Sequence, residues 1–386
     1  MTAMTPTTDQ APSAERLLAA ARGAARTPVL LIDLQRVEDR YRELRAAFAE
    51  AEVLYAVKAN PQPEILTRLA GLGCGFDIAS PGELDLCQAL GRPTALLSYG
   101  NPAKKEADIA AAHAAGVGLF AFDSQMELEK LARAAPGAAT VCRLSVSGAG
   151  AQWPLTHKFG CTVDQAVALL VEAKHVGLKP AGIAFHVGSQ QTQPEAWRHA
   201  IHRAGEVFRL AARAGVSLEF LNLGGGLPAH YSTPLAPLAT YVEVMRSAVA
   251  ASFGASPPRL IIEPGRYMVG DAGALVTEVV LVADRPHERV RRWVYVDAGV
   301  FSGFDETMGE RIRYRLCFDG AERPTGPVVV AGPTCDSADI LYHHGVEAPL
   351  DLAAGERVVF LSAGAYTTSC SSVGFNGFPP LTAQCL

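Results

Sequence analysis

The chain has 386 residues, of which 49% are hydrophobic and 19% charged, and its formal net charge is −5. This length allows two or three domains with a large core, and the hydrophobic content excludes an intrinsically disordered chain. Acidic side chains outnumber basic ones, 39 to 34, and no apolar run reaches the ~18 residues of a membrane-spanning helix, so we expect neither a nucleic-acid nor a membrane partner.

The first elements form a strand-and-helix pattern after a polar start. Residues 1 to about 25 are rich in Thr, Ala and Pro, which predicts a loose arm. The apolar run Val29–Ile32 predicts a strand. After it, apolar residues recur at helical spacing, at Val37, Tyr41, Leu44 and Phe48.

Eight short apolar runs follow, and segments rich in helix-forming residues separate most of them. The runs are Val53–Val57, Gly75–Ile78, Ala95–Ser98, Gly118–Phe122, Thr140–Leu144, Gly182–Val187, Glu219–Leu223 and Leu260–Glu263. This alternation predicts an α/β fold of parallel β/α units, and eight units close a (β/α)8 barrel. An open, doubly wound sheet remains the alternative.

From Gly273 onward the pattern changes to strands separated by turns, with little helical periodicity between them. The strand-like runs are Ala274–Val282, Trp293–Val296, Val328–Ala331 and Arg357–Ser362. They predict a second, mostly antiparallel β domain, and Val29–Ile32 fits either domain. We assign residues 35–265 to the barrel, and residues 1–34 with 266–386 to the β domain.

Eight cysteines occur without any Cys-x-x-Cys pair. In a chain of this size the pattern indicates reduced thiols in a cytoplasmic protein, and it disfavours a disulfide framework or a metal site. The N-terminus also lacks the basic and apolar regions of a signal peptide. We therefore expect a cytoplasmic protein with no bound metal.

Polar residues gather where the predicted barrel strands end, which is the face on which barrel enzymes build active sites. They are Lys58, Asp77, Arg143, His186, Gly224–Gly226 and the Glu263-Pro264-Gly265-Arg266 run. Backbone N–H groups of a triple glycine can approach an anion closely, and Arg266 can add charge-assisted hydrogen bonds. The sequence therefore predicts a phosphorylated small ligand.

Lys58 directly follows an apolar strand in the run Tyr55-Ala56-Val57-Lys58-Ala59-Asn60. Lysine is rarely buried without a partner or a reaction, and desolvation turns its amine into a Schiff-base nucleophile. On this motif alone, a lysine that only reaches out to solvent at the barrel rim remains equally possible.

Seven motifs occur in one order along the chain and together resemble the fold-type III pyridoxal-phosphate decarboxylases, ornithine/lysine group. The resemblance spans residue 28 to the C-terminus, and that family pairs an alanine-racemase-like barrel with a C-terminal β domain. The motifs are Tyr55–Asn60, Phe76–Ser80, His186–Ser189, Gly224–Gly226, Glu263–Arg266, Gly332–Asp336 and Gly364–Thr367.

The resemblance implies a cofactor site for pyridoxal 5'-phosphate on the barrel. Lys58 would be the Schiff-base lysine, Glu263 would contact the pyridine nitrogen, and His186 would stack on the ring. Asp77 and Arg143 would form a polar pair near Lys58, with a structural salt bridge as the alternative. The phosphate would be held by Ser189, Gly225, Gly226, Gly265, Arg266 and Tyr366.

The resemblance also implies a homodimer that shares its active sites. Cys335 and Asp336 would enter the partner's site, where Cys335 returns a proton to Cα and Asp336 binds the distal ammonium of the substrate. Glu310 and Asp305 lie in the segment that measures substrate length in relatives. Many relatives carry Asp there, so Gly309 and Glu310 in the nearest register leave the preferred chain length open.

These features predict α-decarboxylation of a basic L-amino acid, with L-ornithine as the first candidate and putrescine and CO₂ as products. Lysine, arginine and diaminopimelate remain alternative substrates, although diaminopimelate decarboxylases typically carry Glu where Asp336 stands. Glu263 and Cys335 disfavour a racemase. A non-catalytic decarboxylase-like regulator is the alternative from another class, and the presence of Lys58 and the phosphate contacts argues against it.

Overall fold

The computed structural model describes residues 11–91, 97–155, 158–320 and 323–386, and it divides the chain into two compact units. The barrel unit comprises Glu38–Pro228 and Leu235–Tyr267. The β unit comprises the described residues of Met1–Val37, Ala229–Pro234 and Met268–Leu386. The short segment Ala229–Pro234 therefore lies in the β unit, whereas the sequence-based division places it in the barrel.

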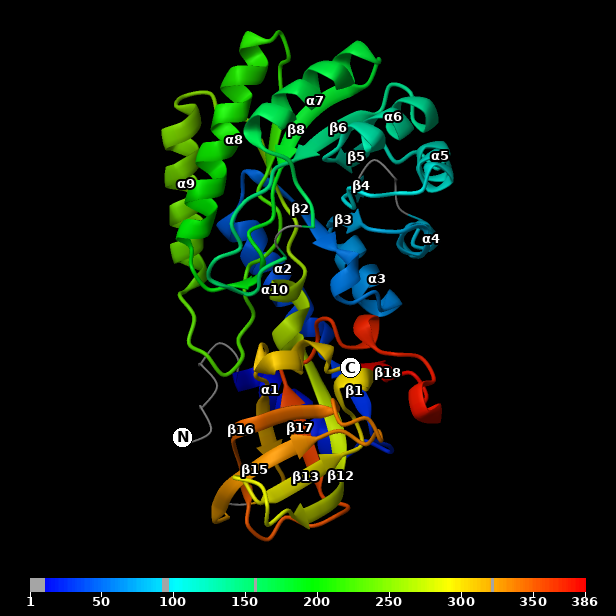
Figure 1. Ribbon diagram of the computed structural model, residues 1–386, viewed down its shortest axis with the longest axis vertical. Coiled ribbons are helices and arrows are strands. Elements are labelled where there is room, and N and C mark those ends of the chain that lie inside the picture. The colour runs from blue at the N-terminus through cyan, green and yellow to red at the C-terminus, as the bar shows by residue number, and fades with distance from the viewer. Residues whose placement is uncertain (1–10, 92–96, 156–157, 321–322) are drawn as a thin grey trace. The chain divides into compact units, whose positions relative to one another are not determined.

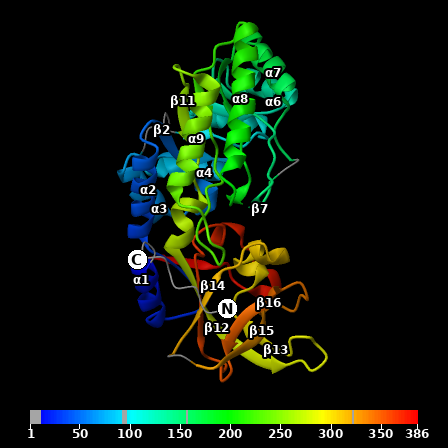
Figure 2. The ribbon, with the colours of Figure 1, turned by 90° about the vertical axis from the view of Figure 1, so that its left-hand side faces the viewer.

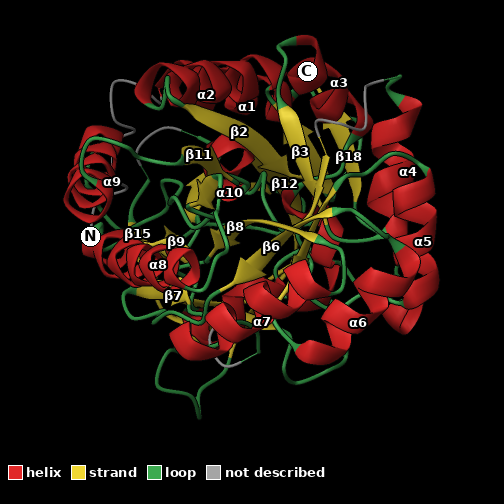
Figure 3. Ribbon diagram, turned by 90° about the horizontal axis from the view of Figure 1, so that it is seen from above, coloured by secondary structure: helices red, strands yellow, loops and turns green. Residues whose placement is uncertain are grey.

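Within the described ranges, eight parallel strands close the barrel, in the order β10-β11-β2-β3-β4-β5-β6-β8 (Figure 3). The predicted barrel is thus confirmed over the open sheet. The strands are β2 (Ala51–Ala56), β3 (Gly75–Ile78), β4 (Leu97–Tyr99), β5 (Leu119–Phe122), β6 (Ala139–Arg143), β8 (Lys179–Ala184), β10 (Phe220–Asn222) and β11 (Arg259–Ile262).

The barrel is a packed core and not a pore. Its interior is filled largely by one cluster of buried apolar side chains from successive strands: Leu54, Ala121, Val141, Ala181, Ala184, Phe220 and Ile261. Because a strand alternates its two faces, the intervening residues, such as Phe76 and Phe120, are buried outside the ring of strands. Most residues on both faces of the strands are apolar, which explains the nearly continuous apolar runs in the sequence.

Helices surround the strands, as Figure 3 shows from above. They are α2 (Leu34–Ala47), α3 (Pro63–Gly71), α4 (Pro81–Ala89), α5 (Glu106–Ala114), α6 (Gln125–Ala134), α7 (Val163–His175), α8 (Glu195–Arg213) and α9 (Leu238–Phe253). The short helix α10 (Arg266–Val269) comes after β11 and is not part of this ring. Local capping sets several starts. Thr162 and Gln165 form a reciprocal capping box at α7, and Ser80 accepts the Glu83 N–H at α4.

Helices α8 and α9 run side by side on the outside of the barrel (Figure 2). Trp197 on α8 meets the Tyr241 ring of α9 edge-on, with centroids 5.7 Å apart. The Trp197 Nε1–H also donates to the Leu223 carbonyl, 3.2 Å away, directly before the triple glycine. One buried side chain therefore packs the two helices together and ties them to the end of β10.

The β unit is a curled, mostly antiparallel sheet, as predicted (Figure 1). Its main path runs β14-β17-β12-β13-β15-β16, and β1 pairs with both β12 and β18. The strands are β1 (Val29–Ile32), β12 (Gly273–Asp284), β13 (Arg292–Val296), β14 (Arg315–Phe318), β15 (Thr325–Ala331), β16 (Ile340–Pro349), β17 (Arg357–Leu361) and β18 (Thr382–Cys385). Two further strands, β7 (Ala151–Trp153) and β9 (Ser189–Gln191), pair with each other in the barrel unit.

The structure assigns one N-terminal strand to a domain and corrects the prediction for the residues before it. Val29–Ile32, which fitted either domain, belongs to the β unit because β1 pairs with β12 and β18. The predicted loose arm is wrong from residue 11, because Ala11–Arg22 forms helix α1. Its buried face, which includes Leu17, packs into a core cluster with β1 and β12, and this tertiary burial outweighs the weak local pattern.

No helix among the described residues is both long enough and apolar enough to cross a membrane.

The packing of α8 predicts a large loss of stability for Trp197→Ala. The substitution removes a side chain that is 1% exposed together with its hydrogen bond to Leu223, so the free energy of unfolding should fall by about 3–5 kcal/mol. Urea unfolding followed by circular dichroism measures this change. His199→Ala, two positions along on the exposed face of α8, should stay within about 0.5 kcal/mol of wild type, and an equal loss in both variants would contradict the assignment.

Candidate functional site

Lys58 lies at the carboxyl end of β2, in the short 3₁₀ helix η1 (Val57–Ala59). Its Nζ is 3.0 Å from Oδ2 of Asp77, whose side chain is 2% exposed, against 45% for Lys58. Parallel pairing of β2 with β3 sets Asp77 opposite Ala56, two residues before Lys58. The register of the barrel strands thus places the buried Asp77 carboxylate next to the accessible Lys58 amine.

Glu263 follows β11 and is held by an amide that the sequence alone did not single out. Asn222, at the end of β10, donates from Nδ2 to Glu263 Oε1 at 2.5 Å, and its Oδ1 accepts the Gly224 N–H at 2.9 Å. Because a backbone N–H can only donate, that second bond fixes the amide orientation and leaves Nδ2 to face the carboxylate. An amide at a strand end, two residues before a glycine run, was the available sequence signal.

Burial dominates the electrostatics of Glu263. Desolvation, and next the nearby Asp77 carboxylate, raise the pKa of Glu263 to about 7, although Lys58, the Asn222 hydrogen bond and Arg143 act in the opposite direction. An acid with this pKa takes up or releases a proton near neutrality. A cationic N–H group placed against Glu263 would therefore readily stabilise its ionised form.

His186 follows β8 and is kept neutral. Burial, together with the Arg143 and Lys58 charges, lowers the pKa of His186 to about 3. Its Nδ1 accepts the Gly188 N–H at 3.0 Å, so the neutral ring carries its proton on Nε2. A Cβ added to Gly225 would lie 3.2 Å from that Nε2, which places the imidazole against the glycine loop.

The triple glycine is required by its close packing. Gly224 and Gly226 have φ values of +65° and +106°, a region that L side chains rarely adopt. A Cβ at Gly224 would lie 2.0 Å from the Phe185 carbonyl oxygen, and one at Gly225 would lie 2.7 Å from that of Glu263. The backbone of the loop after β10 therefore packs directly against the ends of the neighbouring strands, with no side chain between them.

Ser189 and Arg266 come together, as predicted for groups that would share one anion. Both the Nε and the Nη2 of Arg266 donate to Ser189 Oγ at 3.1 Å, and both residues are buried. Gly265, immediately before Arg266, has no room for a side chain, because a Cβ there would lie 2.9 Å from that of Ala59. The site thus holds a buried cation and a hydroxyl beside glycine backbone.

The expected pair of Asp77 with Arg143 is not what the structure shows. Among the described residues, Asp77 forms its ion pair with Lys58, and the Arg143 guanidinium lies over the Phe159 ring, 5.3 Å from its centroid. The charges that favour ionised Arg143 are those of Glu263, Asp123 and Asp77. Arg143 therefore interacts electrostatically with all three carboxylates, and its contact with Asp77 is not a direct ion pair.

The predicted residues of the β unit are set in two turns. The Cys335 N–H donates to Asn376 Oδ1 at 3.2 Å, and Cys335 Sγ lies 3.4 Å from the same oxygen. Asp336 is exposed, and its Oδ1 accepts the Ala338 N–H at 2.8 Å. The turn therefore presents a thiol and a carboxylate side by side on an exposed segment.

Three other predicted residues lie elsewhere in the β unit. Glu310 forms an ion pair with Arg313 and accepts the His343 N–H at 2.7 Å, so both of its carboxylate oxygens are engaged in the structure. Asp305 begins the 3₁₀ segment η5 (Asp305–Glu310). Tyr366 has a φ of +55°, an unfavourable conformation for a tyrosine that the surrounding fold must impose.

The barrel residues fit pyridoxal phosphate by their chemistry. An amine (Lys58), a carboxylate for a ring N–H (Glu263) and a neutral imidazole (His186) gather at one end of the barrel, beside the Ser189–Arg266 pair. Asp77 Oδ2 faces the Lys58 amine, while its Oδ1 is buried against Gly100, where an added Cβ would lie 2.1 Å from it, so the carboxylate is fixed in place beside the amine. The glycine loop supplies a cradle that any side chain would fill.

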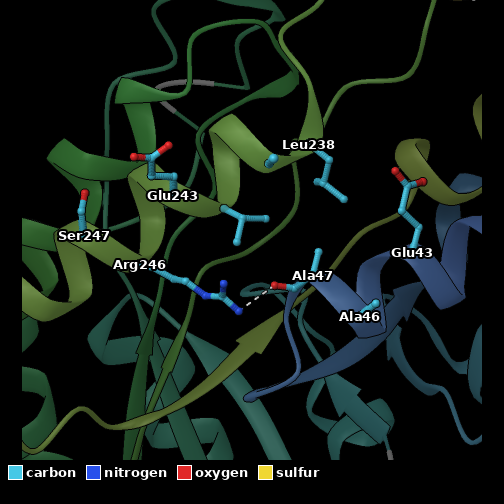
Figure 4. A pocket seen from close by; sticks show the side chains of 9 residues that line it. Glu43, Ala46, Ala47, Leu238, Glu243, Arg246 and Ser247 are labelled. Carbon is cyan, nitrogen blue, oxygen red and sulfur yellow. Dashed lines mark hydrogen bonds between the residues drawn. The ribbon is translucent and has the colours of Figure 1, made fainter.

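A separate groove of about 720 Å³ lies on the outside of the barrel, between α2 and α9 (Figure 4). Arg246 crosses it to donate to the Ala47 carbonyl at 2.9 Å. Its lining residues are Glu43, Ala46, Ala47, Leu238, Ala239, Val242, Glu243, Arg246 and Ser247. None of these belongs to the strand-end cluster, so the groove is not part of the candidate active site.

Comparisons with known proteins agree with this chemistry. Residues 34–270 match the family model described as pyridoxal-dependent decarboxylase, pyridoxal binding domain. The chain is 38% identical over 355 residues to a lysine/ornithine decarboxylase of Selenomonas ruminantium, covering 91% of this chain and 88% of that protein. It is 34% identical over 340 residues to mouse (Mus musculus) ornithine decarboxylase, covering 84% and 73%.

A solved structure shows the same fold over nearly the whole chain. It is the lysine/ornithine decarboxylase of Vibrio vulnificus complexed with cadaverine, with a TM-score of 0.86 and 30% identity over 96% of this chain and 98% of that one. The family model covers the barrel with the Lys58, His186, Glu263 and glycine-loop positions, and the structural match extends the likeness through the β unit. The chain therefore belongs to the pyridoxal-dependent decarboxylases of the ornithine, lysine and arginine group, and its cofactor is pyridoxal 5'-phosphate.

Proposed function

We propose that this enzyme removes the α-carboxylate of L-ornithine, yielding putrescine and CO₂, with L-lysine as its second substrate. The observation that carries the decarboxylase chemistry is the Glu263 carboxylate, held by Asn222 at the end of the barrel that also presents the Lys58–Asp77 pair. An anion at the pyridine nitrogen keeps that nitrogen protonated, which a carbanion-forming reaction needs. All three relatives named above carry ornithine in their names.

L-lysine is kept as a second substrate because of the contacts that Glu310 makes. A longer carboxylate side chain in the length-measuring segment nominally favours the shorter substrate, but Glu310 is tied to Arg313 and to the His343 N–H. A carboxylate engaged in this way reaches less far as a substrate anchor. The Selenomonas relative, named for both lysine and ornithine, supports the same reading.

Each barrel residue has a defined task in the proposal. Pyridoxal phosphate, when bound, withdraws the electron pair that departing CO₂ leaves on Cα. The Lys58 amine would hold the aldehyde carbon of the cofactor, and Asp77 keeps that amine in place. Glu263 would hold the ring N–H, neutral His186 would lie against the ring, and Arg266 with Ser189 and the glycine loop would bind the phosphate.

The β unit would supply the remaining groups to a second subunit. We propose a homodimer in which the exposed Cys335 and Asp336 enter the partner's active site. There Cys335 donates its proton to Cα after CO₂ leaves, and the Asp336 carboxylate binds the distal ammonium of the substrate. The exposure of both residues on one short turn supports this arrangement.

We also propose a cytoplasmic location. All eight cysteines are free thiols in the structure, as a reducing compartment requires. A fluorescent fusion observed in intact cells tests this location.

Substrate and catalysis are tested together by CO₂ release from ornithine, lysine, arginine and diaminopimelate, each offered separately to the purified enzyme with pyridoxal phosphate. We expect the highest kcat/KM for ornithine and the next for lysine. Lys58→Ala should lower it by about 10³-fold or more, because the nucleophilic amine is lost. Lys105→Ala, an exposed lysine on the barrel unit, should retain wild-type activity.

A higher kcat/KM for arginine or diaminopimelate than for ornithine would overturn the substrate assignment. Absence of CO₂ from all four, in protein that still binds the cofactor, would instead favour the regulator alternative.

The environment of Glu263 predicts a pH-dependent stability of the cofactor-free protein. Its pKa of about 7 lies above the ordinary value of 4.5, so the folded state holds a proton that the unfolded chain has released. The free energy of unfolding therefore decreases as pH rises from about 4.5 through 7. Glu263→Gln should remove this contribution, which is at most about 3 kcal/mol between pH 4.5 and 8.

Urea unfolding of wild type and Glu263→Gln, measured between pH 4.5 and 8, gives the difference directly. Asp77, Lys58 and Arg143 are present in both proteins, so the pH-dependent part of the difference reports on the Glu263 carboxyl together with its interactions with these groups. A difference that does not change with pH would show that Glu263 is not desolvated.

A further inference from the structure

Cys335 and Asn376 are 41 residues apart in sequence and meet in the β unit through one amide oxygen. Asn376 Oδ1 accepts the Cys335 backbone N–H at 3.2 Å, and the Cys335 thiol donates to the same oxygen at 3.4 Å. The first bond fixes the backbone of the cysteine and the second fixes its sulfur. A single side chain thus restrains both the position and the rotamer of the thiol.

The loop that carries Asn376 adopts an unfavourable backbone conformation to present this amide. Asn376 has φ +51° and ψ 21°, in the left-handed region, and Gly374 and Gly377 on either side have φ values of +76° and +79°. Asparagine tolerates this conformation better than other residues with side chains. Left-handed residues other than glycine persist where the surrounding structure fixes them, and they cluster at functional sites.

The two turns that meet at this amide are each anchored separately. On the Asn376 side, the Phe375 ring packs on the Phe301 ring with centroids 4.7 Å apart, and the Ser372 N–H donates to the Phe301 carbonyl at 2.9 Å. On the cysteine side, buried Asp339 accepts both the N–H and the hydroxyl of Thr334, at 3.0 and 2.7 Å. Restrained turns on both sides make the amide–thiol contact a defined one.

We propose that Asn376 is a positioning residue for Cys335, which holds the sulfur in place and keeps its proton on Sγ until CO₂ has left. The inference rests on the proposed function, in which Cys335 is the proton donor. An S–H···O bond is weak, so rotation about Cβ–Sγ can release the proton without moving the sulfur. The carbonyl oxygen favours the thiol, because a thiolate would face an acceptor with no proton between them.

The step balances as a proton transfer. The Cα–carboxylate bond breaks and leaves its electron pair, the Sγ–H bond breaks, and a Cα–H bond forms. The thiolate then regains a proton from water. If the proton goes instead to the cofactor carbon bonded to the substrate nitrogen, hydrolysis releases an aldehyde, and the nitrogen stays on the cofactor as its amine form.

The test compares Asn376→Gly with Asn376→Asp. Glycine removes the amide and accepts the left-handed backbone freely, so it isolates the side chain from the loop conformation. Aspartate keeps an oxygen acceptor of the same size in a residue that also tolerates this conformation. Cys335→Ala defines the maximum aldehyde fraction. Circular dichroism melting of all three variants establishes that each is folded.

Two readouts are taken on the purified enzyme. The first is the fraction of turnovers that end in aldehyde and the amine form of the cofactor, measured by chromatography. The second is the rate at which iodoacetamide alkylates Cys335, followed by peptide mass mapping with and without cofactor. Alkylation reports on the thiol itself because only the thiolate reacts.

We expect Asn376→Gly to raise both the aldehyde fraction and the alkylation rate by about 3- to 10-fold, the equivalent of losing the hydrogen bond that the thiol donates. Asn376→Asp should keep the wild-type aldehyde fraction and slow the alkylation. Wild-type values of both quantities in Asn376→Gly would overturn the proposal. If the wild type released no CO₂ from any basic amino acid, the proposed function and the role of Cys335 as proton donor would fail together. The alkylation rates would still report on the contact between Asn376 and the thiol.

Discussion

One buried amide, that of Asn222, is the contact on which the strand-end cluster depends. Its oxygen accepts the first N–H of the glycine loop, and its nitrogen donates to the Glu263 carboxylate. The Glu263 N–H returns a bond to the Gly224 carbonyl at 2.9 Å. The ends of β10 and β11, the loop that would bind a phosphate and the carboxylate that would bind a ring nitrogen therefore form one connected structure.

Desolvation gives the neighbouring groups their different protonation states. The same burial that raises the pKa of Glu263 lowers that of His186, because a low dielectric disfavours whichever form is charged. Asp77 remains beside Lys58 as an ion pair, with only the lysine substantially exposed. One site thus contains a neutral aromatic base, a carboxyl group that titrates near neutrality and an accessible amine, as cofactor binding and carbanion chemistry require.

Sequence reasoning succeeded where a local pattern carries the information and failed where a contact joins distant segments. Strands such as Gly75–Ile78 were found because their apolar runs are short and continuous. Strand β16 was missed because His343, His344 and Gly345 interrupt its apolar pattern. The roles of Asn222 and Asn376 were missed for a different reason, since an asparagine at a strand end or in a turn ordinarily serves its own backbone.

The sequence by itself determined the number and order of the β/α units, the second β domain and the positions of Lys58, His186, the glycine loop and Glu263. All of these follow from periodicity or from short motifs, which are properties of adjacent residues. Only the tertiary structure decided that Asp77 pairs with Lys58 while Arg143 lies over Phe159, that β1 joins the β unit, and that Glu310 accepts the His343 N–H. These pairings depend on barrel register, burial and the approach of segments tens to hundreds of residues apart, and no spacing along the chain encodes them.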